Sequence, residues 1–138
     1  MTERQLQEKL LTYRLLESRL ESLLKQREMI ANKIMEIQIT AESIDEIEKS
    51  KEEILFPLGS EAYTLGKATG KGKIIVEIGA NVALEKTVEE GKQTLRKRQQ
   101  ELGNVLQELQ NNISEISKAL PKLEAEIQAS APSGKQAG

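Results

Sequence analysis

The side chains that most often carry out catalysis are missing from this sequence. It contains neither Cys nor His among its 138 residues, which excludes disulfides, thiolate zinc sites, cysteine nucleophiles and imidazole acid/base catalysis. The remaining carboxylates, lysines and arginines form no cluster that would bring together a nucleophile, a base and a metal ligand. We therefore expect a protein that is not an enzyme and that needs no cofactor or metal.

Two basic segments have the composition of phosphate-binding sites. The run from Lys67 to Lys73 combines lysines with glycines, but it has neither the Gly-x-x-x-x-Gly-Lys-Ser/Thr spacing of a phosphate loop nor Gly-x-Gly-x-x-Gly. The run from Lys92 to Arg98 could contact nucleic-acid phosphates, yet the chain has only one Phe, two Tyr and no Trp with which to stack bases. We expect a solvated turn at the first segment and no nucleic-acid binding at the second.

The composition as a whole is typical of long helices. Charged residues make up 30% of the chain and apolar residues 38%, and the formal net charge is only -2. No apolar run is long enough to cross a membrane, and the polar N-terminus does not resemble a signal peptide. We expect a cytoplasmic protein with no membrane partner.

A coiled-coil helix is predicted for residues 1–53. Apolar side chains recur there at heptad spacing for about six heptads, without Pro or Gly. The two seam positions hold Leu6, Tyr13, Leu20, Arg27, Ile34 and Ala41, and Lys9, Leu16, Leu23, Ile30, Ile37 and Ile44. Charged side chains at a seam can extend outward to water and fix the register of the pairing.

A second seam predicts another coiled-coil helix over residues 85–128. Its seven-residue repeat consists of Val88, Leu95, Leu102, Leu109, Ile116 and Leu123, and Leu106, Ile113, Leu120 and Ile127 flank the repeat four residues on. Gly91 and Gly103 each weaken this helix by about 1 kcal/mol relative to Ala, and Pro121 is expected to kink or fray its last turns. Residues 129–138 are rich in Ala, Ser and Gly, and we expect a disordered tail there.

Charge placement favours pairing of the two helices within one chain, although the same seams could also join different chains. If the chain folds back on itself, residues whose numbers sum to roughly 137 lie opposite each other, because both helices rise equally per residue. Acidic residues then lie beside basic ones, which is how coiled coils select partner and register. They are Glu42, Asp45, Glu46 and Glu48 against Lys92, Arg96, Lys97 and Arg98.

The segment from residue 54 to residue 84 interrupts the helical pattern. It contains Pro57, five glycines and dense β-branched residues, and it divides into four short strands that form two hairpins. The predicted fold is mainly α with a small β insertion, in which a long antiparallel coiled-coil hairpin carries two β-hairpins at the joint.

These hairpins are predicted to form an oligomerisation segment. The third strand is apolar on both faces, and small hairpins with apolar faces and open edges pair with other chains. The alternative is that the hairpins pack on the bases of their own helices. The residues expected to close a sheet or barrel shared between subunits are Phe56, Leu58, Tyr63, Leu65, Ile74, Ile75, Val76, Ile78 and Val82.

Taken together, helix, two hairpins and helix resemble prefoldin, and more specifically its α-type subunit in a compact, archaeal-like form. The residues that carry the resemblance are Pro57-Leu58-Gly59, Ala62-Tyr63-Thr64 with Gly66-Lys67, and the stretch from Lys73 to Lys86. Two hairpins rather than one indicate the α type. Gly91 departs from the small Ala expected near the start of the second helix.

The resemblance implies an ATP-independent molecular co-chaperone made of two α-type and four β-type prefoldin subunits. Its hairpins would form a β-barrel platform, and its coiled-coil tips would capture non-native client proteins and deliver them to a group II chaperonin. A structural coiled-coil spacer or tether is the alternative, and the helical arm of an enzyme has the least support.

The tips are the expected client-binding site. Leu11 and Leu15 lie off the seam and one helical turn apart, so they should form an apolar strip that the partner helix cannot cover. Fraying could instead fold both leucines into the tip, and single exposed leucines often have no function. The full set of expected tip residues is Leu6, Leu10, Leu11, Tyr13, Leu15, Leu120, Leu123 and Ile127.

Overall fold

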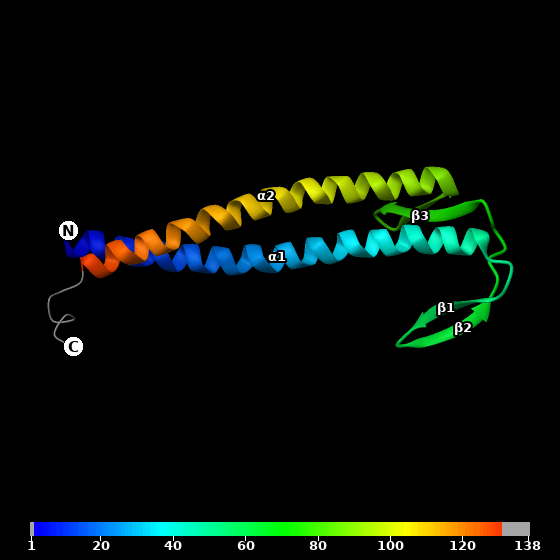
Figure 1. Ribbon diagram of the computed structural model, residues 1–138, viewed down its shortest axis with the longest axis horizontal. Coiled ribbons are helices and arrows are strands. Elements are labelled where there is room, and N and C mark those ends of the chain that lie inside the picture. The colour runs from blue at the N-terminus through cyan, green and yellow to red at the C-terminus, as the bar shows by residue number, and fades with distance from the viewer. Residues whose placement is uncertain (1, 131–138) are drawn as a thin grey trace. The chain divides into compact units, whose positions relative to one another are not determined.

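The fold consists of two long helices with two β-hairpins between them in the chain (Figure 1). It is seen in a computed structural model that describes residues 2–130. The elements are α1 (Glu3–Lys49), β1 (Ile54–Gly59), β2 (Ala62–Gly66), β3 (Lys73–Gly79), β4 (Val82–Thr87) and α2 (Val88–Ala129). The predicted fold class is confirmed.

The helix boundaries differ from those predicted. Helix α1 ends at Lys49 rather than at residue 53, and the Lys71 ammonium donates to the carbonyl of Ser50 just beyond it. Strand β4 continues past Leu84 to Thr87, because Lys73 on β3 still pairs with Thr87 on β4. Helix α2 therefore begins at Val88 rather than at residue 85.

The C-terminal end of α2 also departs from expectation. The helix continues through Pro121 to Ala129, so the described residues show no fraying at the proline. Proline has no backbone N–H, and the carbonyl of Ser117 consequently loses the helical partner it would have at position 121. Ala129, the first residue of the predicted tail, is helical, and residues 131–138 lie outside the described part of the chain.

The chain divides into two compact units. The described residues of 1–32 and 104–138 form one, which we call the terminal unit, and residues 33–103 form the other, the hairpin unit. In the terminal unit the core consists of Leu23, Leu109, Ile113 and Ile116 from the two predicted seams. Because these residues come from both helices, the seam pairs α1 with α2 within one chain.

The hairpin unit has a core of its own. Ile37 and Ile44 of α1 pack with Leu95 of α2, and Ile74 of β3 packs against this cluster. Lys92 forms an ion pair with Asp45, and the Gln99 side chain donates to the Gln38 side chain over 3.3 Å. Both pairs have residue numbers that sum to 137, so the predicted antiparallel register is confirmed in this unit.

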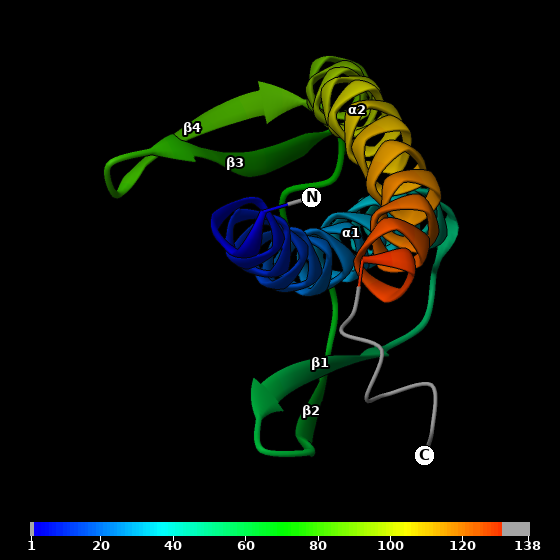
Figure 2. The same cartoon turned by 90° about the vertical axis from the view of Figure 1, so that its left-hand side faces the viewer.

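The two hairpins share one design, and they form separate two-stranded sheets (Figure 2). The first pairs Ile54 with Gly66, and the second pairs Ile74 with Lys86, so the register recurs with an offset of 20 residues. Each hairpin shifts register just before a glycine and then turns through two residues with positive φ. Such a two-residue turn matches the twist of the strands.

Candidate functional site

An apolar strip lies on the outer side of α1 near its N-terminus. The Leu11 side chain is 59% exposed and the Leu15 side chain 62% exposed, and both lie away from the seam. They are four residues apart, which brings their side chains together on one face of the helix. Leu10 lies at the margin of this face and is also exposed.

The remaining predicted tip residues lie in the seam of the terminal unit and are half-buried; they are Leu6, Tyr13, Leu120, Leu123 and Ile127. Partial burial raises the pKa of the Tyr13 hydroxyl, and the nearby carboxylates of Glu124 and Glu17 raise this pKa further. The predicted tip set therefore separates into an exposed outer strip and a half-covered inner seam.

An ion pair joins the two helices at the inner seam. The Lys9 ammonium lies 2.9 Å from the Glu126 carboxylate, and among the described residues of the terminal unit it is the one ion pair that joins α1 to α2. Beside it is a groove of about 390 Å³ lined by Gln5, Glu8, Lys9, Thr12 and Leu123. Leu123 can thus be reached from this groove without separating the whole seam.

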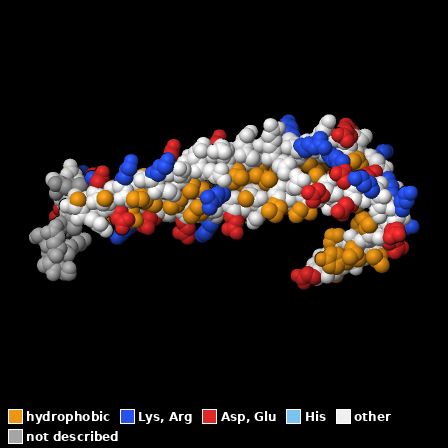
Figure 3. All heavy atoms as spheres, in the orientation of Figure 1, with side chains coloured by type: hydrophobic (Ala, Val, Ile, Leu, Met, Phe, Trp, Pro, Cys, Tyr) orange, Lys and Arg blue, Asp and Glu red, His pale blue; other side chains and the backbone are white. Residues whose placement is uncertain are grey.

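The β1–β2 hairpin exposes most of its predicted oligomerisation residues. Leu58, Tyr63 and Leu65 are exposed, and apolar side chains gather on this hairpin in the space-filling view (Figure 3). Phe56 is half-buried because its ring packs over Gly66, where a Cβ would come within 3.2 Å of the ring. Leu55, which the strand pattern did not single out, is also exposed and pairs with Leu65.

The β3–β4 hairpin has one covered face and one open face. Val76 is 7% exposed whereas the adjacent Ile75 is 75% exposed, and Ile74 packs against the helices. Ile78 and Val82 are exposed. Packing on the helix bases, the alternative considered from the sequence, therefore applies to Ile74 and Val76, and the other predicted residues of this hairpin remain available to a partner chain.

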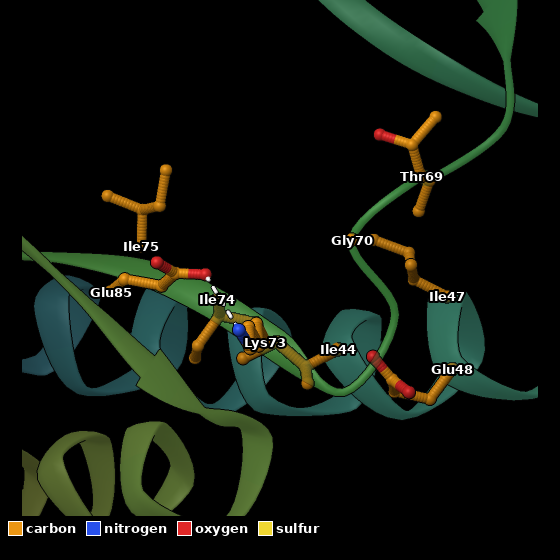
Figure 4. Close-up of a pocket in the computed structure, with 10 residues that line it drawn as sticks. Ile44, Ile47, Glu48, Thr69, Gly70, Lys73, Ile74, Ile75 and Glu85 are labelled. Carbon is orange, nitrogen blue, oxygen red and sulfur yellow. Dashed lines mark ion pairs between the residues drawn. The ribbon is translucent and has the colours of Figure 1, made fainter.

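A pocket of about 460 Å³ opens between α1, the link that follows β2, and β3 (Figure 4). Its walls are largely apolar, with Ile44 and Ile47 on α1 and Ile74 on β3. Its charged groups are already engaged. The Glu48 carboxylate accepts the Gly72 N–H at 2.9 Å, and Lys73 lies 3.6 Å from Glu85.

Groups of the two basic segments are also engaged in contacts within the chain. A phosphate loop presents free backbone N–H groups to its ligand, but the N–H of Gly72 already faces a carboxylate. In the second basic segment Lys92 is paired with Asp45, and the Arg98 guanidinium donates to the carbonyl of Glu77. The described residues contain no group of His, Cys, Asp or Glu that could hold a metal ion.

The fold and the sequence together identify the family. The family model for prefoldin, described as a prefoldin subunit, matches residues 16–132. The chain belongs to the prefoldin family. Within residues 2–130, neither helix of this prefoldin subunit is long and apolar enough to cross a membrane.

Its relatives are archaeal prefoldin subunits of the alpha type, as the resemblance predicted. The chain is 28% identical to prefoldin subunit alpha of Methanosarcina acetivorans over 116 residues, which cover 80% of this chain and 82% of that protein. It is 26% identical to prefoldin subunit alpha of Pyrococcus horikoshii over 119 residues, which cover 84% of this chain and 80% of that protein.

A solved structure shows the same fold. The chain matches the cryo-EM structure of filamentous PFD from Methanocaldococcus jannaschii with a TM-score of 0.70 and 21% sequence identity. The match covers 87% of this chain and 98% of that chain. The arrangement of two helices with two hairpins between them is therefore a prefoldin fold.

Proposed function

We propose that this chain is the α-type subunit of an ATP-independent co-chaperone that captures non-native proteins at its tip. Membership of the prefoldin family supports a co-chaperone role. The observation that carries the finer proposal is the exposure of Leu11 and Leu15 side by side on α1. Contiguous exposed apolar surface is typical of interaction sites on soluble proteins.

The proposed mechanism is weak capture at several points. A buried leucine contributes about 1.5 to 3 kcal/mol, so one tip would hold an apolar segment of a client loosely. Several tips acting on the same client raise the overall affinity by avidity, while each contact still dissociates rapidly. Transfer to a group II chaperonin then needs no nucleotide on this subunit.

The proposed assembly is a hetero-oligomer of two chains of this type with four β-type subunits, acting in the cytoplasm. The exposed apolar residues of the hairpins, such as Leu58 and Tyr63, support a role in binding other subunits. The similarity of this chain to alpha subunits over most of their length favours a complex that contains a second subunit type.

The capture proposal is tested by removing the outer strip. We expect Leu11→Ser combined with Leu15→Ser to leave the mass of the complex with a β-type subunit unchanged. The concentration of complex that halves the aggregation of guanidinium-unfolded citrate synthase should rise roughly tenfold, less than the full loss of two leucine contacts would give, because the tips of the β-type subunits keep their own contacts with the client. Light scattering measures the aggregation, and sedimentation measures the mass.

A matched control lies on the same helix. Met35 and Ile39 are also four residues apart and are 63% and 56% exposed, but they belong to the hairpin unit. Met35→Ser combined with Ile39→Ser should leave the suppression of aggregation unchanged. Equal loss in both double variants, or no loss in the tip variant, would contradict the assignment. A stable dimer that suppresses no aggregation would indicate a structural spacer.

A further inference from the structure

We infer that the last turns of α2, residues 122–129, form a latch over a second client-binding surface, and that the Lys9–Glu126 ion pair holds this latch shut. The inference rests on the proposed function, because it assumes that the tip binds clients. The inference adds to that function a surface that is hidden in the closed state and a residue pair that controls the exposure of this surface.

The latch lies in the weaker of the two helix ends. Pro121 removes one helical hydrogen bond at the point where the latch joins the rest of α2. The last turn of α2 contains no basic residue, although a cation there would interact favourably with the helix dipole. Glu126 places a negative charge in that turn instead. The latch is therefore poorly stabilised by its own helix.

The facing end of α1 is firmly capped. The Thr2 hydroxyl accepts the N–H of Gln5 at 3.2 Å, and the Gln5 side chain accepts the N–H of Thr2 at 3.0 Å. This reciprocal pair is a capping box, which satisfies two N–H groups at the start of a helix. When the tip opens, α1 should stay helical and α2 should move.

The surface under the latch is apolar and only half covered. Leu6 on α1 and Leu123 and Ile127 on the latch are half-buried, and the groove beside Leu123 already has a volume of about 390 Å³. Movement of residues 122–129 would expose all three side chains. This inner surface is separate from the outer strip of Leu11 and Leu15, which is exposed in the closed state.

The ion pair favours the closed state of the latch, but only weakly. The side chains of Lys9 and Glu126 remain 32% and 55% exposed, and ion pairs in such positions change an equilibrium by no more than about fivefold. Lys9 also occupies a seam position of α1, where an apolar residue would hold the tip closed more tightly. An arriving apolar segment can therefore compete with the closed state.

Hydrogen exchange and client capture test the latch together. The full chain, alone and mixed with a β-type subunit, is compared with Glu126→Gln and with Lys9→Gln, which breaks the pair without altering α2. In both variants we expect the backbone amides of residues 122–129 to exchange about two to five times faster. The concentration of complex that halves the aggregation of guanidinium-unfolded citrate synthase should be correspondingly lower.

A charge swap and a matched control complete the test. Lys9→Glu combined with Glu126→Lys should return both measurements to the values of the unchanged chain, or give slower exchange and a higher concentration for half-suppression, since Lys also suits the last turn of α2. Glu115→Gln, which removes an exposed carboxylate elsewhere on α2, should change neither measurement. Unchanged exchange in the single variants would overturn the latch.

The remaining outcomes are equally decisive. Faster exchange without improved suppression would mean that the uncovered surface does not bind clients, which also overturns the inference. Failure of the proposed function has a different signature, because the unchanged chain with its β-type partner would then suppress no aggregation at all.

Discussion

Gly91 decides how the hairpin unit packs. It is buried at the start of α2, and a Cβ in its place would overlap the side chain of Ile74, with only 2.6 Å to the Cγ1 atom. Glycine weakens a helix by about 1 kcal/mol relative to alanine. The close approach of β3 offsets this cost, since it lets Ile74 and Val76 cover the seam between the helices.

We therefore expect Gly91→Ala to destabilise the protein despite the better helix propensity of alanine. Overpacking a well-filled core costs about 1 to 3 kcal/mol, which exceeds the propensity gain. Urea denaturation followed by circular dichroism measures the free energy of unfolding. Combining Gly91→Ala with Ile74→Ala should recover stability relative to Ile74→Ala alone, and a loss of similar size in both backgrounds would contradict the proposed clash.

The sequence could show that Gly91 was unusual but not why. A heptad pattern predicts an apolar side chain on the seam side of α2, and a glycine there counts against the helix. The cause lies in β3, at Ile74 and Val76, which are distant in sequence. No local pattern connects these positions, and for the same reason the sequence left open whether these two residues face their own helices or another subunit.

The junction between β4 and α2 is fixed by a capping box. The Thr87 hydroxyl accepts the N–H of Glu90 at 3.2 Å, and the Glu90 carboxylate accepts the N–H of Thr87 at 3.1 Å and its hydroxyl at 2.8 Å. These hydrogen bonds from Thr87 lower the pKa of Glu90. Thr-x-x-Glu is visible in the sequence, so the start of α2 at Val88 could have been predicted from it.

Thr87→Ala should weaken this junction and reduce its acid sensitivity. Loss of the cap costs about 1 kcal/mol at neutral pH. Because the pKa of Glu90 is lower in the folded than in the unfolded chain, its contribution is present above the ordinary glutamate pKa of about 4.3 and is lost as pH falls through the lowered value. The difference in melting temperature between pH 7 and pH 3, measured by thermal denaturation, should therefore be smaller in the variant.

Thr94→Ala supplies the control for the capping box, since Thr94 lies on the same helix and its hydroxyl donates to the carbonyl of Glu90 rather than to its side chain. This variant should keep the pH dependence of the unchanged chain. If Thr94→Ala and Thr87→Ala altered the pH dependence equally, the capping box would not be its source.

At the scale of the whole molecule, exposed apolar residues occur in both units. The outer strip belongs to the terminal unit, and the open faces of the hairpins belong to the hairpin unit. Helical spacing alone predicted the exposure of Leu11 and Leu15, because the position of a residue in a heptad fixes its direction from the seam. The alternation of side chains along the strands predicted less, since it did not indicate that Leu55, next to Phe56, would be exposed.

Separate variants in the two units should separate assembly from capture. Leu55 and Leu65 are paired across the first hairpin and are 61% and 63% exposed, so Leu55→Ser combined with Leu65→Ser should preserve the helical content of the isolated chain. Burial of both residues between subunits would contribute about 3 kcal/mol or more. The variant should therefore need a roughly hundredfold higher concentration to form the complex with a β-type subunit, as measured by sedimentation.

The tip variant of Leu11 and Leu15 is the control for this experiment and should form that complex normally. An unaffected complex in the hairpin variant would show that the exposed face of β1–β2 is not an assembly surface.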